Sequence, residues 1–306
     1  MSEATQAKVL AAVKELGFYP NHMAQGLRRG HSNTVGLLVG DIEQGVYASL
    51  TKQIQPALEA HGLELLLYNL GHSHERLEKI LMRTASLRLH GIVIATSDQL
   101  TEQTIHSLSS KVKEEDLPVI AVGLPLNGHG IPSIVYNDRA ATGRSTEYLV
   151  KTYQGPAAYV GRISGSVSGE QRYLGYLDGL ARQQINADSA LIWDASYRYK
   201  AGFESVSRAL KSGVKFRSIQ TGSDELAMGA MAAVHAHGLT IPDDVAVVGI
   251  GDLEASAYAN PPLTTHGASP DLVAHKVADI LRQFREGANV DMITQLPRRF
   301  NRRKSA

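Results

Sequence analysis

The sequence predicts an α/β protein with two parallel-sheet units, and three observations support this. The chain has 306 residues, which corresponds to about two domains at roughly 150 residues each. Hydrophobic residues make up 43% of the chain and charged residues 20%, the balance of an ordinary globular protein. From residue 34 onward, short β-branched runs alternate with longer stretches of helical periodicity, which is typical of strand–helix units that build parallel sheets.

Eight short apolar runs predict the strands. Most of them are apolar throughout and do not alternate with polar residues, as expected of strands that helices cover on both faces. In such sheets ligands bind beyond the carboxyl ends of the strands, so the residues just after each run are the candidates for a binding site. The runs cover residues 35–39, 63–67, 92–94, 119–122, 133–136, 157–160, 190–193 and 245–250.

Helical periods occupy the gaps between these runs, with apolar residues spaced to share one helix face. Two examples are the sets Tyr173, Tyr176, Leu177, Leu180 and Ala227, Ala230, Met231, Val234. The first 33 residues do not join the alternating pattern. They contain one apolar stripe within residues 9–16 and a short helical piece within residues 20–30. The single stripe has no visible packing partner in this chain.

Composition excludes several classes of protein. The chain has no cysteine, which excludes a disulfide scaffold, thiolate zinc sites and a cysteine nucleophile, and fits a reducing cytoplasm. No apolar run approaches the ~20 residues of a membrane span, and the charged N-terminus is no secretory signal. We therefore expect a cytoplasmic protein with no membrane partner. A basic cluster at residues 298–304 is interpreted as a solvated tail rather than a nucleic-acid patch.

The motifs tested for chemistry do not assemble a catalytic site. The Gly/Ser-rich stretch at residues 161–169 lacks a P-loop lysine and the dinucleotide and nucleophile-elbow spacings. It is either a flexible strand–helix loop or a ligand-contacting one. His72, His74 and Glu75 lack the spacing of a helical zinc pair, so we interpret them as a polar loop that caps the next helix. The sequence predicts no enzyme activity, no cofactor and no metal.

Several ordered motifs resemble the LacI/GalR family of bacterial transcription regulators, the lactose/galactose/purine repressor family. Together they cover nearly the whole chain, so the resemblance is more specific than any single motif. They are residues 2–5, 9–17, 19–21 and 24–28, the strand regions 36–41 and 90–94, the helix opening at 224–229, and the stretches 241–249 and 262–265.

The resemblance implies a fold with two subdomains like those of periplasmic binding proteins (type I), with an effector cleft between them. By position, residues 1–31 are a remnant helix and hinge helix of the DNA-binding headpiece. Residues 32–153 plus 268–289 form the N-subdomain, and residues 154–267 plus 290–306 form the C-subdomain. The three crossovers between subdomains are expected near residues 154–155, 266–269 and 290–293.

The resemblance also implies how DNA is contacted, with one departure. The first two helices of the family's helix-turn-helix, including the groove-reading one, would lie before Met1. The chain as given is therefore expected not to read a major groove. In the family a hinge-helix leucine wedges into the minor groove, and by position this is Leu27. The expected DNA-binding residues are Ser2, Thr5, Asn21, Leu27 and Arg28.

Positions that match the family's effector contacts follow the predicted strands. The resemblance implies that Tyr197 stacks on the ligand and that Arg172 donates a charged hydrogen bond to it. An ion pair of Arg172 with Asp178 or Glu170 is the alternative. The expected effector-binding residues are Gln44, Tyr47, Thr96, Ser97, Asp98, Ser166, Ser168, Glu170, Arg172, Tyr197, Ser223, Glu225 and Asp252.

Two departures bear on the effector. Sugar-binding relatives often have an aspartate at the positions of Gly123 and Gly251, where it accepts hydrogen bonds from sugar hydroxyls. Losing two acceptors while keeping Arg172 favours a sugar acid, whereas Asp98, Glu170 and Glu225 keep a neutral sugar open. The implied function is a sugar- or sugar-acid-responsive repressor that binds operator DNA as a homodimer. A free-standing solute-binding protein is the alternative. The candidate dimer helices are 47–61, 74–88, 224–237 and 270–286.

Overall fold

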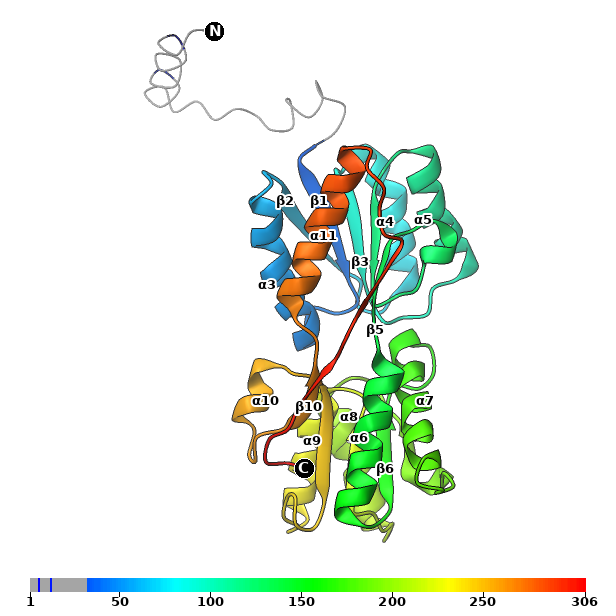
Figure 1. Cartoon of the computed structure of the whole chain (residues 1–306), viewed down its shortest axis with the longest axis vertical. Helices are drawn as coiled ribbons and strands as arrows, with labels where there is room; N and C mark the ends of the chain where they lie inside the picture. The colour runs from blue at the N-terminus through cyan, green and yellow to red at the C-terminus, as the bar shows by residue number, and fades with distance from the viewer. Residues whose placement is uncertain (1–4, 6–11, 13–31) are drawn as a thin grey trace.

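In the computed structural model, which describes residues 5, 12 and 32–306, the chain folds into two lobes, one above the other in Figure 1. Each lobe holds one six-stranded sheet with helices on both faces. The predicted α/β architecture with two doubly wound sheets is confirmed. No helix in the described part of the chain is long and apolar enough to cross a membrane.

The first lobe has a fully parallel sheet with the strand order β11-β5-β4-β3-β1-β2. Helices α3 and α11 cover one face, and α4 and α5 cover the other. Its elements are β1 (Thr34–Val39), α3 (Gly45–Glu59), β2 (Glu64–Asn69), α4 (His74–Leu87), β3 (Gly91–Ala95), α5 (Glu102–Glu114), β4 (Val119–Val122), η1 (Asn127–His129), β5 (Ser133–Tyr136), α11 (Pro270–Arg285) and β11 (Ile293–Leu296).

The second lobe has the strand order β12-β10-β9-β8-β6-β7, parallel except for β12. Helices α8 and α9 cover one face, and α6 and α7 cover the other. Its elements are α6 (Asp138–Tyr153), β6 (Ala157–Gly161), α7 (Val167–Ala181), η2 (Ser189–Leu191), β7 (Ile192–Asp194), α8 (Tyr199–Lys211), β8 (Ser218–Thr221), α9 (Asp224–Ala236), β9 (Ala246–Gly251), α10 (Glu254–Tyr258), β10 (Thr264–Gly267) and β12 (Arg299–Asn301).

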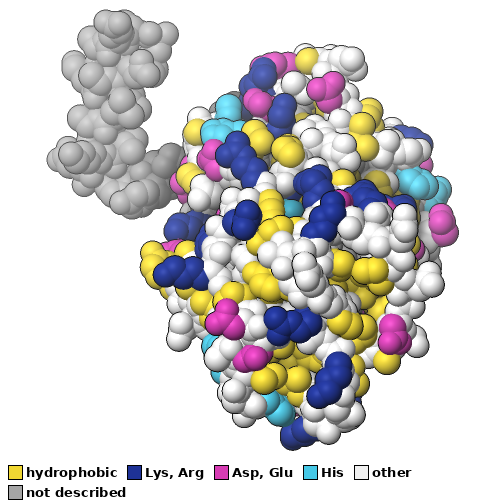
Figure 2. All heavy atoms as spheres, turned by 60° about the horizontal axis from the view of Figure 1, so that its bottom comes forward, with side chains coloured by type: hydrophobic (Ala, Val, Ile, Leu, Met, Phe, Trp, Pro, Cys, Tyr) yellow, Lys and Arg dark blue, Asp and Glu magenta, His cyan; other side chains and the backbone are white. Residues whose placement is uncertain are grey.

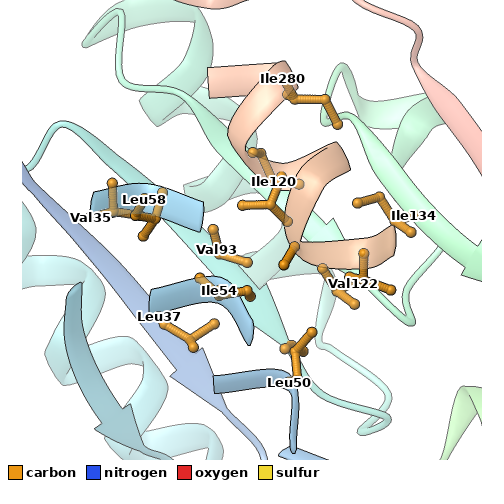
Figure 3. Packing of buried hydrophobic residues seen from close by; sticks show 14 of the residues in the cluster. Val35, Leu37, Leu50, Ile54, Leu58, Val93, Ile120, Val122, Ile134 and Ile280 are labelled. Atoms are coloured by element: carbon orange, nitrogen blue, oxygen red, sulfur yellow. The ribbon is translucent and has the colours of Figure 1, made fainter. Parts of the chain in front are cut away.

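Each sheet carries its own hydrophobic core. Under α3 and α11, strand residues such as Val93 and Ile120 pack against Ile54 and Leu58 of α3 and Ile280 of α11 (Figure 3). Burying one such side chain stabilises the fold by about 1.5–3 kcal/mol. On the face drawn in Figure 2, charged side chains of both signs are scattered among apolar ones, consistent with the net charge of +1.

Two of the three expected crossovers lie elsewhere. Helix α6 packs on α7 and on the second sheet, so the chain first crosses between β5 and α6 and not near residue 154. Strand β11 pairs with β5 of the first sheet, so the last crossing falls between β11 and β12 and not near 290–293. The remaining crossing falls between β10 and α11. Figure 1 shows the three segments passing between the lobes.

The basic C-terminal segment is not the predicted solvated tail. Arg298 is buried, and Arg303 forms an ion pair with Asp252 at 2.6 Å. The Ser305 hydroxyl accepts from the Thr264 backbone N–H at 2.8 Å and donates to the Val247 carbonyl at 2.6 Å. These contacts hold the segment against the second sheet, and both Arg298 and Arg303 form ion pairs with acidic side chains.

Candidate functional site

A cavity of about 130 Å³ lies between the two lobes, at the carboxyl ends of strands from both sheets. A water molecule needs roughly 10–15 Å³ of free space, so the cavity has room for a small organic ligand. Ten of the thirteen predicted effector residues line it: Gln44, Tyr47, Thr96, Ser97, Ser168, Arg172, Tyr197, Ser223, Glu225 and Asp252.

The other three predicted effector residues do not line this cavity. The Asp98 carboxylate accepts from Thr96, from His72 Nδ1 at 2.8 Å and from Arg162 Nη1 at 2.5 Å. Burial raises the pKa of Asp98, but these hydrogen bonds outweigh burial and lower it to about 2. Ser166 caps α7 by accepting from the Gly169 N–H. Glu170 is exposed on the same helix.

One wall of the cavity is cationic. Arg172 Nε on α7 donates to Asp138 Oδ1 at 3.1 Å, and Arg298 Nε donates to the same oxygen at 2.6 Å. Burial raises the pKa of Asp138, yet the two guanidinium groups hold it below its usual value. The Arg172 partner is therefore Asp138, and not Asp178 or Glu170. Asp178 instead pairs with Arg139 at the surface.

The second lobe also offers oxygen acceptors at the cavity. Glu225 Oε1, at the start of α9, accepts from the Gly45 N–H at the start of α3 at 2.9 Å. The neighbouring Asp224 carboxylate is fully buried and accepts from Ser256, from Thr265 and from the Leu253 N–H. Burial raises its pKa. The bond from the Leu253 N–H holds that residue at the edge of the cavity.

Gly251 has φ 146°, in the region that favours glycine. A Cβ there would lie 3.3 Å from the Asp224 carboxylate. A side chain at this position would therefore meet both backbone strain and a buried carboxylate. Both features account for glycine at this position.

Aromatic side chains complete the cavity wall. The Tyr197 ring lies 5.8 Å from the Arg172 guanidinium carbon, and its hydroxyl lies 3.2 Å from Ser166 Oγ. In the first lobe the Tyr47 hydroxyl accepts from the Ser97 N–H, and burial raises its pKa. Both rings are buried, and they offer flat apolar surfaces edged by hydroxyl groups.

Hydrogen bonds connect the lobes on both sides of the cavity. On one side Arg162 binds Asp98, and the Val167 N–H donates to the Ser97 carbonyl at 2.8 Å. On the other side Arg198 binds Asp41 and Glu43. The cavity therefore depends on how the two lobes are positioned relative to each other.

The sequence reasoning did not include several residues that line the cavity. Arg298 and Leu253 line the cavity, as does Tyr136 at the end of β5. The basic cluster was visible in the sequence, but it was assigned to a solvated tail. Only the pairing of β11 and β12 with different sheets brings Arg298 to the cavity.

Most of the expected DNA contacts fall outside the part of the chain that the structure describes. Ser2, Asn21, Leu27 and Arg28 lie outside the described residues. Thr5 is helical and exposed. The polar loop before α4 behaves as expected, because Ser73 caps that helix by accepting from the Arg76 N–H at 3.2 Å.

Two doubly wound lobes with three crossovers, and between them a cavity lined by both charged and hydrophobic side chains, define a ligand-binding protein of the periplasmic-binding-protein type. Residues 32–304 match the family described as periplasmic binding proteins and sugar binding domain of the LacI family. The chain belongs to this family, and its relatives are LacI/GalR-type transcription regulators.

Individual proteins are similar to this chain over most of its length. Catabolite control protein A of Priestia megaterium is 25% identical over 304 residues, which cover 99% of this chain and 90% of the relative. The ribose operon repressor of Escherichia coli is 24% identical over 283 residues, 92% of this chain and 84% of the relative. A crystal structure of the lac repressor dimer bound to operator and the anti-inducer ONPF superposes with a TM-score of 0.88 at 25% identity, covering 100% of this chain and 91% of that one.

Proposed function

We propose that this protein is a transcriptional repressor whose operator binding is controlled by a sugar or sugar acid in the cavity between its lobes. The observation that carries the proposal is the joint construction of the cavity by both lobes in a chain of the LacI family. A ligand that contacts both lobes binds one arrangement of them more tightly than another, and so shifts their equilibrium.

Two copies are proposed to pair about a two-fold axis, so that they match two operator half-sites. The lac repressor structure, a dimer bound to operator, supports this. The candidate helices are α3, α4, α9 and α11, and Ser2, Thr5, Asn21, Leu27 and Arg28 are the proposed DNA contacts. The protein then acts in the cytoplasm without a cofactor, and we propose no enzymatic role.

Chromatin immunoprecipitation of the protein from the cells that produce it tests the regulatory role. A repressor is expected to occupy discrete chromosomal sites, and its occupancy should change when the effector is supplied. The alternative, a free-standing solute-binding protein of the same fold, should show no enrichment at any site with or without the effector. The second result would refute the regulatory proposal while leaving ligand binding intact.

The proposed effector is a sugar acid, with a neutral sugar as the alternative. Two arginines on one wall favour an acid, whereas Glu225 and Asp252 supply acceptors for hydroxyl groups of either ligand. Arg172→Ala is expected to weaken binding of an aldonic acid such as gluconate by about 1.5–3 kcal/mol, the typical loss of a charged hydrogen bond. Glucose binding should change little. Calorimetric titration of both ligands measures the difference.

Arg139→Ala is the matched control, because Arg139 forms its ion pair with Asp178 at the surface. It should leave both titrations unchanged. If Arg172→Ala weakens gluconate and glucose equally, Arg172 supports the site as a whole and the sugar-acid assignment loses its basis.

A further inference from the structure

We infer that Arg298 is a second specificity-determining residue, and that the carboxylate of a sugar acid binds between it and Arg172. The inference rests on the proposed function and adds to it the position of the effector's charged group. The two arginines come from distant parts of the chain, α7 and the crossover between β11 and β12. Both line the cavity.

The first argument is the number of hydrogen-bond donors. Arg172 Nε and Arg298 Nε both donate to Asp138 Oδ1, and Arg172 Nη1 donates to the Gly222 carbonyl at 2.7 Å. Among the described residues, Arg172 Nη2 and both Nη groups of Arg298 have no hydrogen-bond acceptor. A guanidinium group presents its N–H donors as a planar fork that matches a carboxylate.

The second argument is charge. Two guanidinium groups share one carboxylate, so this wall keeps one positive charge in excess. Among the described residues, no acid other than Asp138 forms an ion pair with Arg172 or Arg298, and Asp252 pairs with Arg303. Side-chain exposure is only 12% for Arg172 and 8% for Arg298. An uncompensated charge with little access to water is costly, and a bound anion would compensate it.

The third argument is that Arg298 is held in place. Its guanidinium carbon lies 4.5 Å from the centre of the Tyr136 ring. Its backbone N–H donates to Asn137 Oδ1 at 2.8 Å. Because stacking and backbone contacts fix the side chain before a ligand arrives, little conformational freedom is left to lose on binding.

The test is calorimetry with three sugar acids (gluconate, glucuronate and galacturonate) and two neutral sugars (glucose and galactose). The wild type is expected to bind at least one acid more tightly than the neutral sugars. Arg298→Gln should weaken the binding of that acid by about 10- to 100-fold, as for a lost charged hydrogen bond. It should leave neutral-sugar binding nearly unchanged. Arg299→Gln, at an exposed neighbouring position, should behave as the wild type.

Arg298→Lys guards against a folding defect, because it keeps the charge and loses the planar fork. It should melt near the wild-type temperature and bind the acid less tightly than the wild type. Equal loss of acid and neutral sugar in Arg298→Gln, or no loss in Arg298→Lys, would overturn the inference. Binding of neutral sugars but of no acid would overturn it and leave the proposed function standing. If none of the five ligands binds, both the inference and the proposed effector class are wrong.

Discussion

Asp138→Ala is expected to lower the free energy of unfolding by about 3–5 kcal/mol, the usual cost of removing one partner from a buried ion pair. Asp138 is 4% exposed and is the shared partner of Arg172 and Arg298. The substitution leaves two buried guanidinium groups facing each other without a counter-charge. Urea denaturation followed by circular dichroism measures the change.

Asp178→Ala is the matched control for this prediction. Asp178 also binds an arginine through two hydrogen bonds, but the pair lies at the surface. Exposed pairs contribute about 0–1 kcal/mol. A loss in Asp138→Ala no larger than in Asp178→Ala would show that the shared carboxylate does not stabilise the cationic wall.

The second large effect is a loss of stability between pH 7 and pH 5 that originates at His266. This side chain is fully buried on β10, stacks on Phe300 at 4.6 Å and has no hydrogen-bond partner in the described part of the chain. Burial, with Arg144 and Arg298 nearby, lowers its pKa to about 3. An unfolded histidine takes up a proton near pH 6.5.

The sign follows from proton uptake. Below pH 6.5 the unfolded chain takes up a proton at His266, whereas the folded chain takes it up only near pH 3. The free energy of unfolding therefore falls as the pH falls through this window. Between pH 7 and pH 5 the loss is about 2 kcal/mol. Asp98, with a pKa of about 2, adds its own loss only below about pH 4. The raised pKa of Asp224 acts in the opposite direction.

His266→Leu removes the titrating ring, so its stability should change less than that of the wild type between pH 7 and pH 5. His61→Leu, at an exposed position, should keep the wild-type dependence. Denaturant titrations at the two pH values give the comparison. If the wild type and His266→Leu lose the same stability, another group causes the acid sensitivity.

The sequence predicted the apolar part of the fold best. Strands β4 and β5 lie where the apolar runs placed them, because a buried parallel strand has to be apolar on both faces. Strand β8 was missed because its buried residues are largely polar. Gln220, for example, is fully buried and accepts from Ser145 Oγ at 2.6 Å. Such a strand can be recognised only when the hydrogen-bond partners of its buried polar side chains are known.

The residues of the candidate site likewise include some that the sequence could predict and some that it could not. Thr96 directly follows the apolar strand β3 and lies at the cavity, where the topology of a parallel sheet places ligand contacts, whereas Ser223 follows the missed strand β8 and was named only through the family resemblance. Arg298 was not predicted, because it reaches the cavity through the exchange of sheets between β11 and β12. The Asp138 partnership joins residues 160 positions apart. Local spacing carries no trace of such a contact.

The contacts of Arg298 also determine how the lobes can move. Its backbone and side chain bind Asn137 and Asp138, which join two of the three connecting segments at one point. Through the stacking of His266 on Phe300, the remaining segment is anchored beside them. We therefore expect the two lobes to rotate about this point and not to slide past each other. A ligand bound close to this rotation point needs to cause only a small shift there, because the displacement that a rotation produces grows with distance and is largest at the far end of each lobe.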